Sequence, residues 1–205
     1  MSGSDLVSAA YPLAYPFRKL TGNAGQIQQA NRSIRSNMEW TGLANPTDGA
    51  LAATGVGCAV PIPVEVGDRL SKITVLIGAT AGGTLTHSFA ALYSGIAVPA
   101  LLAQSKDGEA AAIAEKLPFG FTLESEVEIT QANAPNGFIY ASVAITATTV
   151  PTAAVVSTPT AIGYKWFTNG PLFLAATHGT ALAGTAPATI ASPAAKAVAP
   201  LVFVS

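Results

Sequence analysis

Short apolar runs separated by glycine, proline and asparagine fill the chain from residue 57 onward. Residues 72–78 (KITVLIG) are apolar and β-branched, as in a buried strand, and residues 119–124 (FGFTLE) alternate, as in a strand with one buried face. Further strands are expected over residues 58–66, 85–93, 97–104, 138–146, 171–177 and 200–204. About eight short strands divided by turns predict an all-β domain, an antiparallel β-sandwich or jelly roll.

Three segments of this domain carry more specific expectations. Pro61 and Pro63 favour an edge position for the strand over 58–66, because proline has no N–H for a second neighbouring strand. Residues 107–116 (DGEAAAIAEK) are the best helix candidate, with about three turns. Residues 181–199 are close to low complexity and are expected to form a long surface loop.

The first quarter of the chain differs from the rest. Tyr-Pro steps at residues 11–12 and 15–16 favour extended backbone, because the residue before a proline avoids the helical region. Residues 26–35 are a candidate for one short helix. Since no amphipathic period here is long enough to fold alone, the sequence predicts an extended N-terminal arm over residues 1–55 and a β-sandwich domain over residues 56–205.

The composition points to an assembly. Only 10% of the residues are charged, against about 25% in a typical soluble domain, and 50% are hydrophobic. Low charge leaves large weakly polar surfaces, which other subunits normally cover. We therefore expect a homo-oligomer.

The charge balance bears on the class of partner. Ten Lys and Arg are matched by eleven Asp and Glu, so the basic patch that phosphate binding requires is not expected, nor is a nucleic-acid partner. Residues 141–163 are uncharged but rich in threonine, and Pro151 and Pro159 interrupt them. They are expected to form two strands and a turn, not a membrane-spanning helix, so no membrane partner is expected.

The sequence shows no specific signature of catalysis, a metal or a cofactor. His87 and His178 fall in or beside predicted strands, no GxSxG elbow accompanies them, and no carboxylate follows residue 128. Residues 107–109 (DGE) lack the spacing of a calcium loop. The lone Cys58 builds no disulfide within the chain and is expected to be a small buried residue. The expectation is a protein that is not an enzyme and binds no cofactor.

A row of acids admits two readings. Glu124, Glu126 and Glu128 lie at a spacing of two, so they face one side of a strand together. Paired carboxylates are the requirement of glycoside hydrolysis. The preferred interpretation is a solvated face or a rim that meets basic partners, since like charges on an edge resist wrong strand pairing.

Aromatic and basic residues are the candidates for partner binding, because this composition is typical of binding hot spots. In the arm they are Tyr11, Tyr15, Phe17, Arg18, Lys19, Arg32, Arg35 and Trp40. The bland alternative for residues 1–40 is a disordered tail. A second cluster stands before the turn at residues 169–170 and is expected at a subunit interface, with a sugar-stacking platform as the alternative: Tyr164, Trp166 and Phe167.

Three runs carry a resemblance to a known group of proteins: residues 91–123 (ALYSGIAVPALLAQSKDGEAAAIAEKLPFGFTL), 136–152 (NGFIYASVAITATTVPT) and 169–182 (NGPLFLAATHGTAL). A strand that ends in Tyr93, a strand that ends in LAQS, an alanine-rich stretch and a TTVPT tail follow one another. This order resembles β-sandwich domains in virion proteins of tailed phages that infect actinobacteria. The resemblance covers roughly residues 67–182 and is more specific for fold than for role.

The resemblance implies a place on a phage particle. A small standalone domain with an arm looks like a head decoration or minor capsid protein that attaches to and stabilises the capsid through its arm. Its partners would be the major capsid protein or another virion protein, and copies of itself as a homotrimer. The alternative is a small tail or baseplate receptor-binding protein that binds carbohydrate, and a sugar-active enzyme is the third reading.

Overall fold

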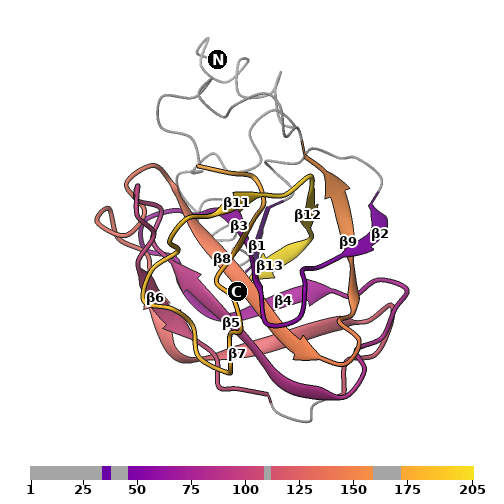
Figure 1. The fold of residues 1–205 in the computed structure, drawn as a ribbon. Helices are drawn as coiled ribbons and strands as arrows, with labels where there is room; N and C mark the ends of the chain where they lie inside the picture. The colour runs from indigo at the N-terminus through magenta and orange to yellow at the C-terminus, as the bar shows by residue number, and fades with distance from the viewer. Residues whose placement is uncertain (1–33, 38–45, 109–111, 159–171) are drawn as a thin grey trace, which may run out of the picture. The chain divides into compact units, whose positions relative to one another are not determined.

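Antiparallel strands form the whole regular structure of the part of the chain that the computed structural model describes, residues 34–37, 46–108, 112–158 and 172–205 (Figure 1). No helix occurs among these residues, so the predicted all-β class is confirmed. In chain order the strands are β1 (Arg35–Ser36), β2 (Thr47–Ala50), β3 (Gly57–Pro63), β4 (Arg69–Leu76), β5 (Leu85–Tyr93), β6 (Leu101–Gln104), β7 (Pro118–Glu128), β8 (Phe138–Ala147), β9 (Thr152–Ser157), β10 (Ala176–His178), β11 (Ala194–Ala195), β12 (Val198–Pro200) and β13 (Val202–Val204).

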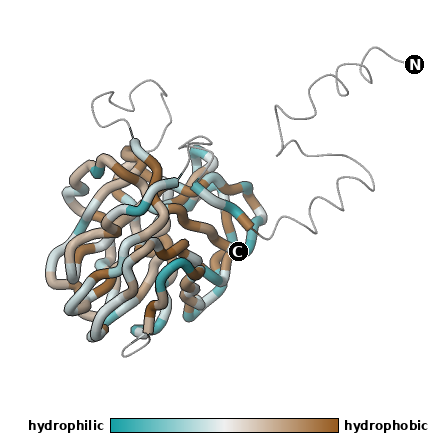
Figure 2. The backbone as a smooth tube through the Cα atoms, turned by 90° about the vertical axis from the view of Figure 1, so that its right-hand side faces the viewer, coloured by the Kyte–Doolittle hydropathy of each residue, from teal (hydrophilic) through white to brown (hydrophobic). Residues whose placement is uncertain are grey.

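The strands belong to three sheets within one compact unit that begins at Ile34. The largest sheet has the order β11-β10-β3-β8-β5-β6, the second has the order β1-β13-β4-β7, and the third has the order β12-β9-β2. Every pair in them is antiparallel. The arrangement is sandwich-like, and hydrophobic segments run along its strands (Figure 2).

The two central strands of the largest sheet are buried on both faces. β8 is buried at its first eight positions and β3 at its first six. One face, which includes Val60, Leu92 and Val143, packs in the main core with residues of β4, β7 and β9. Burial of a large aliphatic side chain contributes about 1.5–3 kcal/mol, so this core is the main source of stability.

The opposite face of the same sheet carries a second, aromatic core. Tyr93 and Tyr140 are fully buried there, and Phe173, Ala186 and Ile190 cover them from segments late in the chain. The backbone of residues 188–190 also bonds to the backbone at residues 99–101. The expectation of a surface loop over residues 181–199 is therefore wrong in part, because this low-complexity segment forms one wall of a core.

β7 confirms the predicted alternation. Phe121, Leu123 and Val127 are buried, while the residues between them are exposed. Because β7 is the last strand of its sheet, its outer edge is not paired with a further strand of that sheet.

The prolines of β3 are placed as their chemistry requires, although β3 is not an edge strand throughout. β10 pairs with β3 only at residues 57–59, whereas β8 pairs with all seven residues of β3. Pro61 and Pro63 lie beyond the end of β10, in the part of β3 that has a neighbour on one side.

The predicted helix over residues 107–116 does not form at the described positions 107–108 and 112–116. The Asp107 carboxylate accepts a hydrogen bond from the Ser88 backbone N–H and contacts the His87 ring. Ile113 is buried in the main core, and its carbonyl accepts a bond from the Gly82 N–H. Tertiary contacts therefore outweigh local helix propensity in this alanine-rich stretch.

The predicted boundary at residue 55 differs from the observed one, because residues 34–55 supply strands to the compact unit. β1 pairs with β13, and β2 pairs with β9 over four residues. The buried Asn37 side chain donates to the Pro200 carbonyl (2.7 Å) and accepts from the Val202 N–H (3.0 Å). The predicted arm is therefore limited to residues 1–33, which lie outside the described residues together with most of the helix candidate at 26–35.

Candidate functional sites

A buried serine–histidine pair lies between two strands of the largest sheet. The Ser142 hydroxyl on β8 is 2.7 Å from His178 Nε2 on β10, and both residues are 4% exposed. Gly57 provides the space, because a Cβ at that position would lie 2.6 Å from the same nitrogen. The edge of the imidazole packs against the Tyr93 ring, with centroids 5.8 Å apart.

This pair lacks the surroundings of a catalytic dyad. Among the described residues, no group hydrogen-bonds to His178 Nδ1, so no carboxylate orients the ring as in a catalytic triad. The near-complete burial also leaves a substrate no approach to Ser142 Oγ. The hydrogen bond satisfies the Ser142 hydroxyl and His178 Nε2 inside the sheet, whereas buried His178 Nδ1 has no hydrogen-bond partner among the described residues, so the expected satisfied histidine is found for one ring nitrogen.

Burial makes stability depend on pH through this histidine. It lowers the pKa of His178 from 6.5 to about 4, because the charged ring would lose its hydration. Below pH 6.5 the imidazole of His178 becomes protonated in the unfolded chain, whereas in the folded chain it becomes protonated only near pH 4. We predict that unfolding free energy falls by about 3 kcal/mol between pH 6.5 and 4, in urea titrations.

Two variants separate the pH dependence due to His178 from the pH dependence due to carboxylates. Ser142→Ala/His178→Phe removes the titrating ring and its partner together, and the fall in unfolding free energy between pH 6.5 and 4, called the step below, should become smaller. His87→Gln removes the other histidine and should keep the step. An unchanged step in the double variant would assign the pH dependence to other groups.

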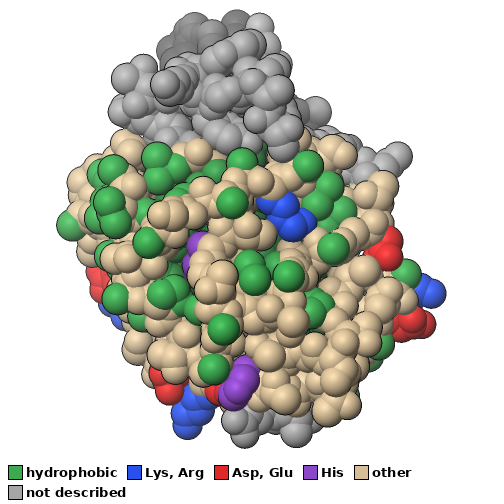
Figure 3. All heavy atoms as spheres, in the orientation of Figure 1, with side chains coloured by type: hydrophobic (Ala, Val, Ile, Leu, Met, Phe, Trp, Pro, Cys, Tyr) green, Lys and Arg blue, Asp and Glu red, His purple; other side chains and the backbone are tan. Residues whose placement is uncertain are grey.

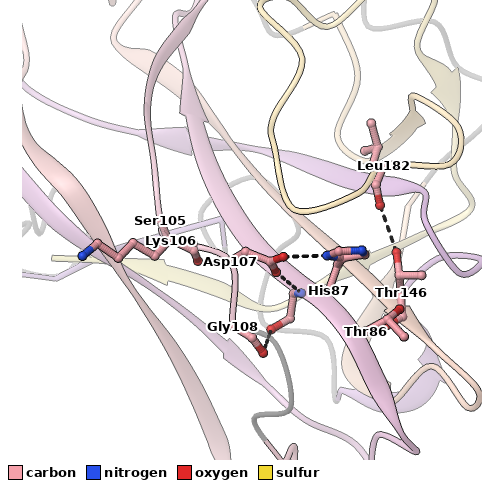
Figure 4. A network of polar contacts seen from close by, with 9 residues as sticks. Thr86, His87, Ser105, Lys106, Asp107, Gly108, Thr146 and Leu182 are labelled. Carbon is pink, nitrogen blue, oxygen red and sulfur yellow. Dashed lines mark hydrogen bonds and ion pairs between the residues drawn. The ribbon is translucent and has the colours of Figure 1, made fainter.

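A second histidine contact lies at the surface (Figure 4). His87 Nδ1 is 2.6 Å from Asp107 Oδ2, and the two side chains are 29% and 23% exposed. The other carboxylate oxygen accepts the Ser88 N–H at 2.9 Å. Gly184 packs against this carboxylate with φ +74°, where a Cβ would lie 2.3 Å from Oδ2, so both space and conformation require glycine.

The hydroxyls around this pair are engaged with the backbone. Ser88 donates to the Gly108 carbonyl, Ser105 donates to the Lys106 carbonyl, and Thr146 donates to the Leu182 carbonyl. Each hydroxyl proton is thus committed to a main-chain oxygen, and not to the imidazole. The contacts fasten residues 105–108 to β5, which is a structural role.

A groove of about 520 Å³ lies beside this fastened segment. It runs between residues 105–108 and residues 119–124 of β7. β6 and β7 are edge strands of the two larger sheets, and one isolated bridge between Ser105 and Leu123 joins them here. Figure 4 shows Lys106 extending to the side of Asp107 opposite to His87. No pattern in the sequence predicts this groove, because its walls come together only when the two sheets pack.

The predicted row of acids lies on the exposed face of β7. Arg69 pairs with Glu126 and Glu128, each at 3.0 Å, between side chains that are 49–62% exposed. Glu124 lies at the groove and forms no ion pair within the described part of the chain. The three carboxylates thus form a solvent-exposed row with Arg69 as the neighbouring cation, in agreement with the solvated face predicted from the sequence.

Four large aliphatic side chains are exposed near the start of β8, and we call them the apolar end: Val66, Ile96, Val98 and Leu172, with exposures of 63%, 38%, 61% and 50%. Backbone bonds place their segments there. The Val64 N–H donates to the Gly137 carbonyl, the Gly95 N–H donates to the Asn133 carbonyl, and the Leu172 N–H donates to the Tyr140 hydroxyl. Sequence reasoning missed this surface, because its members are single residues in separate loops.

One predicted partner-binding residue lies among the described residues, and it is buried. The Arg35 side chain is 3% exposed, and its Nη2 lies 2.8 Å from Asp68 Oδ2 and 3.9 Å from Glu65 Oε2. Its charge is therefore compensated within the domain and is not presented to a partner. The other candidates lie outside the described residues: Tyr11, Tyr15, Phe17, Arg18, Lys19, Arg32, Trp40, Tyr164, Trp166 and Phe167.

Three further features of the described residues bear on metal, thiol and membrane chemistry. No group of three or more His, Cys, Asp or Glu is placed to hold a metal ion in the part of the chain that the structure describes. Cys58 is 1% exposed, and burial raises its thiol pKa to about 11, so it is not a reactive thiolate. Among the described residues, none belongs to a helix with the length and hydropathy needed to cross a membrane.

Comparison with known proteins finds no match for this chain, either to a family model or to a curated protein.

Proposed function

We propose that this chain is a non-catalytic structural protein of a bacteriophage particle. In this proposal it is a head decoration or minor capsid protein that stabilises the capsid surface, and its attachment depends on the N-terminal arm. Its partners are the major capsid protein or another virion protein and further copies of itself, arranged as a homotrimer. The phage assignment rests on the sequence resemblance, and the role in assembly rests on the surface of the domain.

The apolar end is the observation that carries the role in assembly. Val66, Val98 and Leu172 each expose half or more of their surface, and hydrogen bonds tie Val64, Gly95 and Leu172 in the same segments to residues 133–140 at the start of β8. Removing such a side chain from water contributes about 1.5–3 kcal/mol, so a partner surface would be strongly favoured there. Gathered apolar side chains on a soluble domain mark interaction sites.

The distribution of charge agrees with this reading. In Figure 3 the charged side chains lie largely at the rim of the view, while apolar and uncharged polar groups cover the face. Depletion of charge is the compositional mark of an interface core. With 10% charged residues in the whole chain, few charges would have to be desolvated when such a face is covered.

A matched pair of charge insertions tests the role of this surface. Val98→Asp places a carboxylate on the apolar end, whereas Leu117→Asp places one at a residue of similar exposure, 57%, where β7 begins. We expect the trimer of the Val98 variant to dissociate at a higher protein concentration than that of the Leu117 variant, which keeps the trimer of the unaltered chain. A stable monomer for the unaltered chain, or equal association of both variants, would contradict the proposal.

A further inference from the structure

The groove beside β7 exposes the edge of a β-sheet. β7 is the outermost strand of its sheet, and β6 lies beside it, joined to it by the isolated Ser105–Leu123 bridge and by no continuous ladder among the described residues. Alternate residues of an edge strand direct N–H and C=O groups outward, so such an edge is a template for another strand. Residues 105–108 line the opposite side of the groove, so a strand added to β7 would have a wall on its other side.

The lining of the groove defines the kind of strand that fits. Phe119 and Phe121 meet edge to face, with centroids 5.0 Å apart, and Phe119 is only partly buried. At the other end, Glu124 offers a carboxylate that forms no ion pair within the described residues. The groove therefore suits an extended segment with large apolar side chains on one face and a basic residue at one end.

Residues 11–19 (YPLAYPFRK) of this chain have that pattern. In an extended strand Tyr11, Leu13, Tyr15 and Phe17 share one face, because side chains alternate. Pro12 and Pro16 are four residues apart, so their missing N–H groups fall on the same edge of the strand. The opposite edge keeps its full set of N–H and C=O groups, which is the arrangement in which proline is tolerated in an added strand.

Charge and length favour the same occupant. Residues 1–33 hold three basic residues and one acid, whereas residues 34–205 hold seven basic residues and ten acids. Opposite net charges attract a basic segment to the domain. The linking residues 20–33 span up to about 45 Å when extended, well beyond the radius of gyration of about 16 Å for a domain of this size.

We propose that residues 11–19 of one copy add as a strand to β7 in the groove of a second copy. The aromatic face would meet Phe119 and Phe121, and Arg18 and Lys19 would lie near Glu124. Main-chain hydrogen bonds supply the affinity in such strand addition, and the side-chain positions supply the register. This inference goes beyond the proposed function, because it concerns contacts between copies in solution and needs no particle.

Linked copies would also explain why attachment to a particle depends on the arm. Copies joined by their arms present several weak attachment sites at once, and joint binding is much tighter than single binding. Deleting the arm would remove this gain without altering the domain surface.

Cysteine pairing between two full-length variants tests the contact. Ala14→Cys, on the face away from the aromatic residues, is mixed under oxidising conditions with a size-tagged copy that carries Thr122→Cys, an exposed position in the groove. The control copy carries Ala195→Cys, an exposed position on the edge strand β11. The buried Cys58 remains in all copies.

We expect the mixed disulfide dimer with Thr122→Cys to form at least tenfold faster than with Ala195→Cys. Equal rates for the two partners would overturn the proposal. So would a chain carrying both Ala14→Cys and Thr122→Cys that forms its disulfide only within one chain and never between two chains. A negative result in the cysteine pairing does not change the result expected from sedimentation of the Val98 and Leu117 variants. The two proposals can therefore be rejected independently.

A charge swap provides the second test on the same cross-link. Glu124→Lys should slow the pairing, and Arg18→Glu in the arm-bearing copy should restore it. Glu115→Lys makes the same charge change at an exposed residue that does not line the groove, and it should have no effect. Equal slowing by both lysine variants, or no rescue by Arg18→Glu, would contradict the assigned register.

Discussion

A chain that starts at Leu51 is expected to lose its cooperative unfolding transition, whereas a chain that starts at Ile34 keeps it. The shorter chain lacks β1 and β2, so the Pro200 carbonyl and the Val202 N–H lose the Asn37 side chain inside the domain. Each buried polar group left without a partner costs about 1–3 kcal/mol. Together with the lost pairing of β2 along β9, this approaches the whole stability of a typical domain, about 5–15 kcal/mol.

Circular dichroism during heating distinguishes the two chains. A sharp melt is expected for the chain from Ile34, and a weak, broad change for the chain from Leu51. If both melt alike, β1 and β2 are dispensable for folding, which would agree with the domain boundary predicted from the sequence at residue 55.

Asp68→Ala is expected to destabilise the fold by about 3–5 kcal/mol, because it leaves a buried guanidinium without its main carboxylate. The Asp68 carboxylate lies 2.8–2.9 Å from Arg35 Nη2 and also accepts the Glu65 N–H at 2.9 Å. The matched control is Glu128→Ala, which breaks the exposed pair with Arg69 and should cost less than about 1 kcal/mol. Urea denaturation measures both.

A second variant distinguishes the loss of the ion pair from a loss of side-chain packing at Asp68. Arg35→Met/Asp68→Leu removes both charges and should recover most of the stability lost in Asp68→Ala, since the desolvation cost disappears with the pair. Similar costs for Asp68→Ala and Glu128→Ala would show that Arg35 is solvated in solution and that β1 does not pack as described.

Strands with a clear period could be read from the sequence, and strands held only by distant partners could not. β5 has the predicted bounds, with its last six residues all buried, and β7 shows the predicted alternation, with one buried face. β1 has two residues and pairs with β13 across the length of the chain. No local pattern predicts such a strand, so the boundary of the arm was placed too late.

The same distinction between local patterns and distant contacts applies to the candidate sites. The place of His178 at a strand end was predictable, but only its Nε2 is hydrogen-bonded, and the partner Ser142 lies 36 residues away, at a spacing that carries no signal in the sequence. The apolar end and the groove arise from loops and edges that meet only in the folded domain. The aromatic cluster Tyr164, Trp166 and Phe167 stays a prediction, because it lies outside the described residues.

Co-sedimentation with purified capsids that lack the chain tests the central claim most directly. The full chain and a chain without residues 2–33 are each mixed with the capsids, and bound protein is measured in the pellet. The account predicts that the full chain pellets at a fixed ratio to the major capsid protein while the shortened chain stays in the supernatant. A full chain that remains in the supernatant would contradict it.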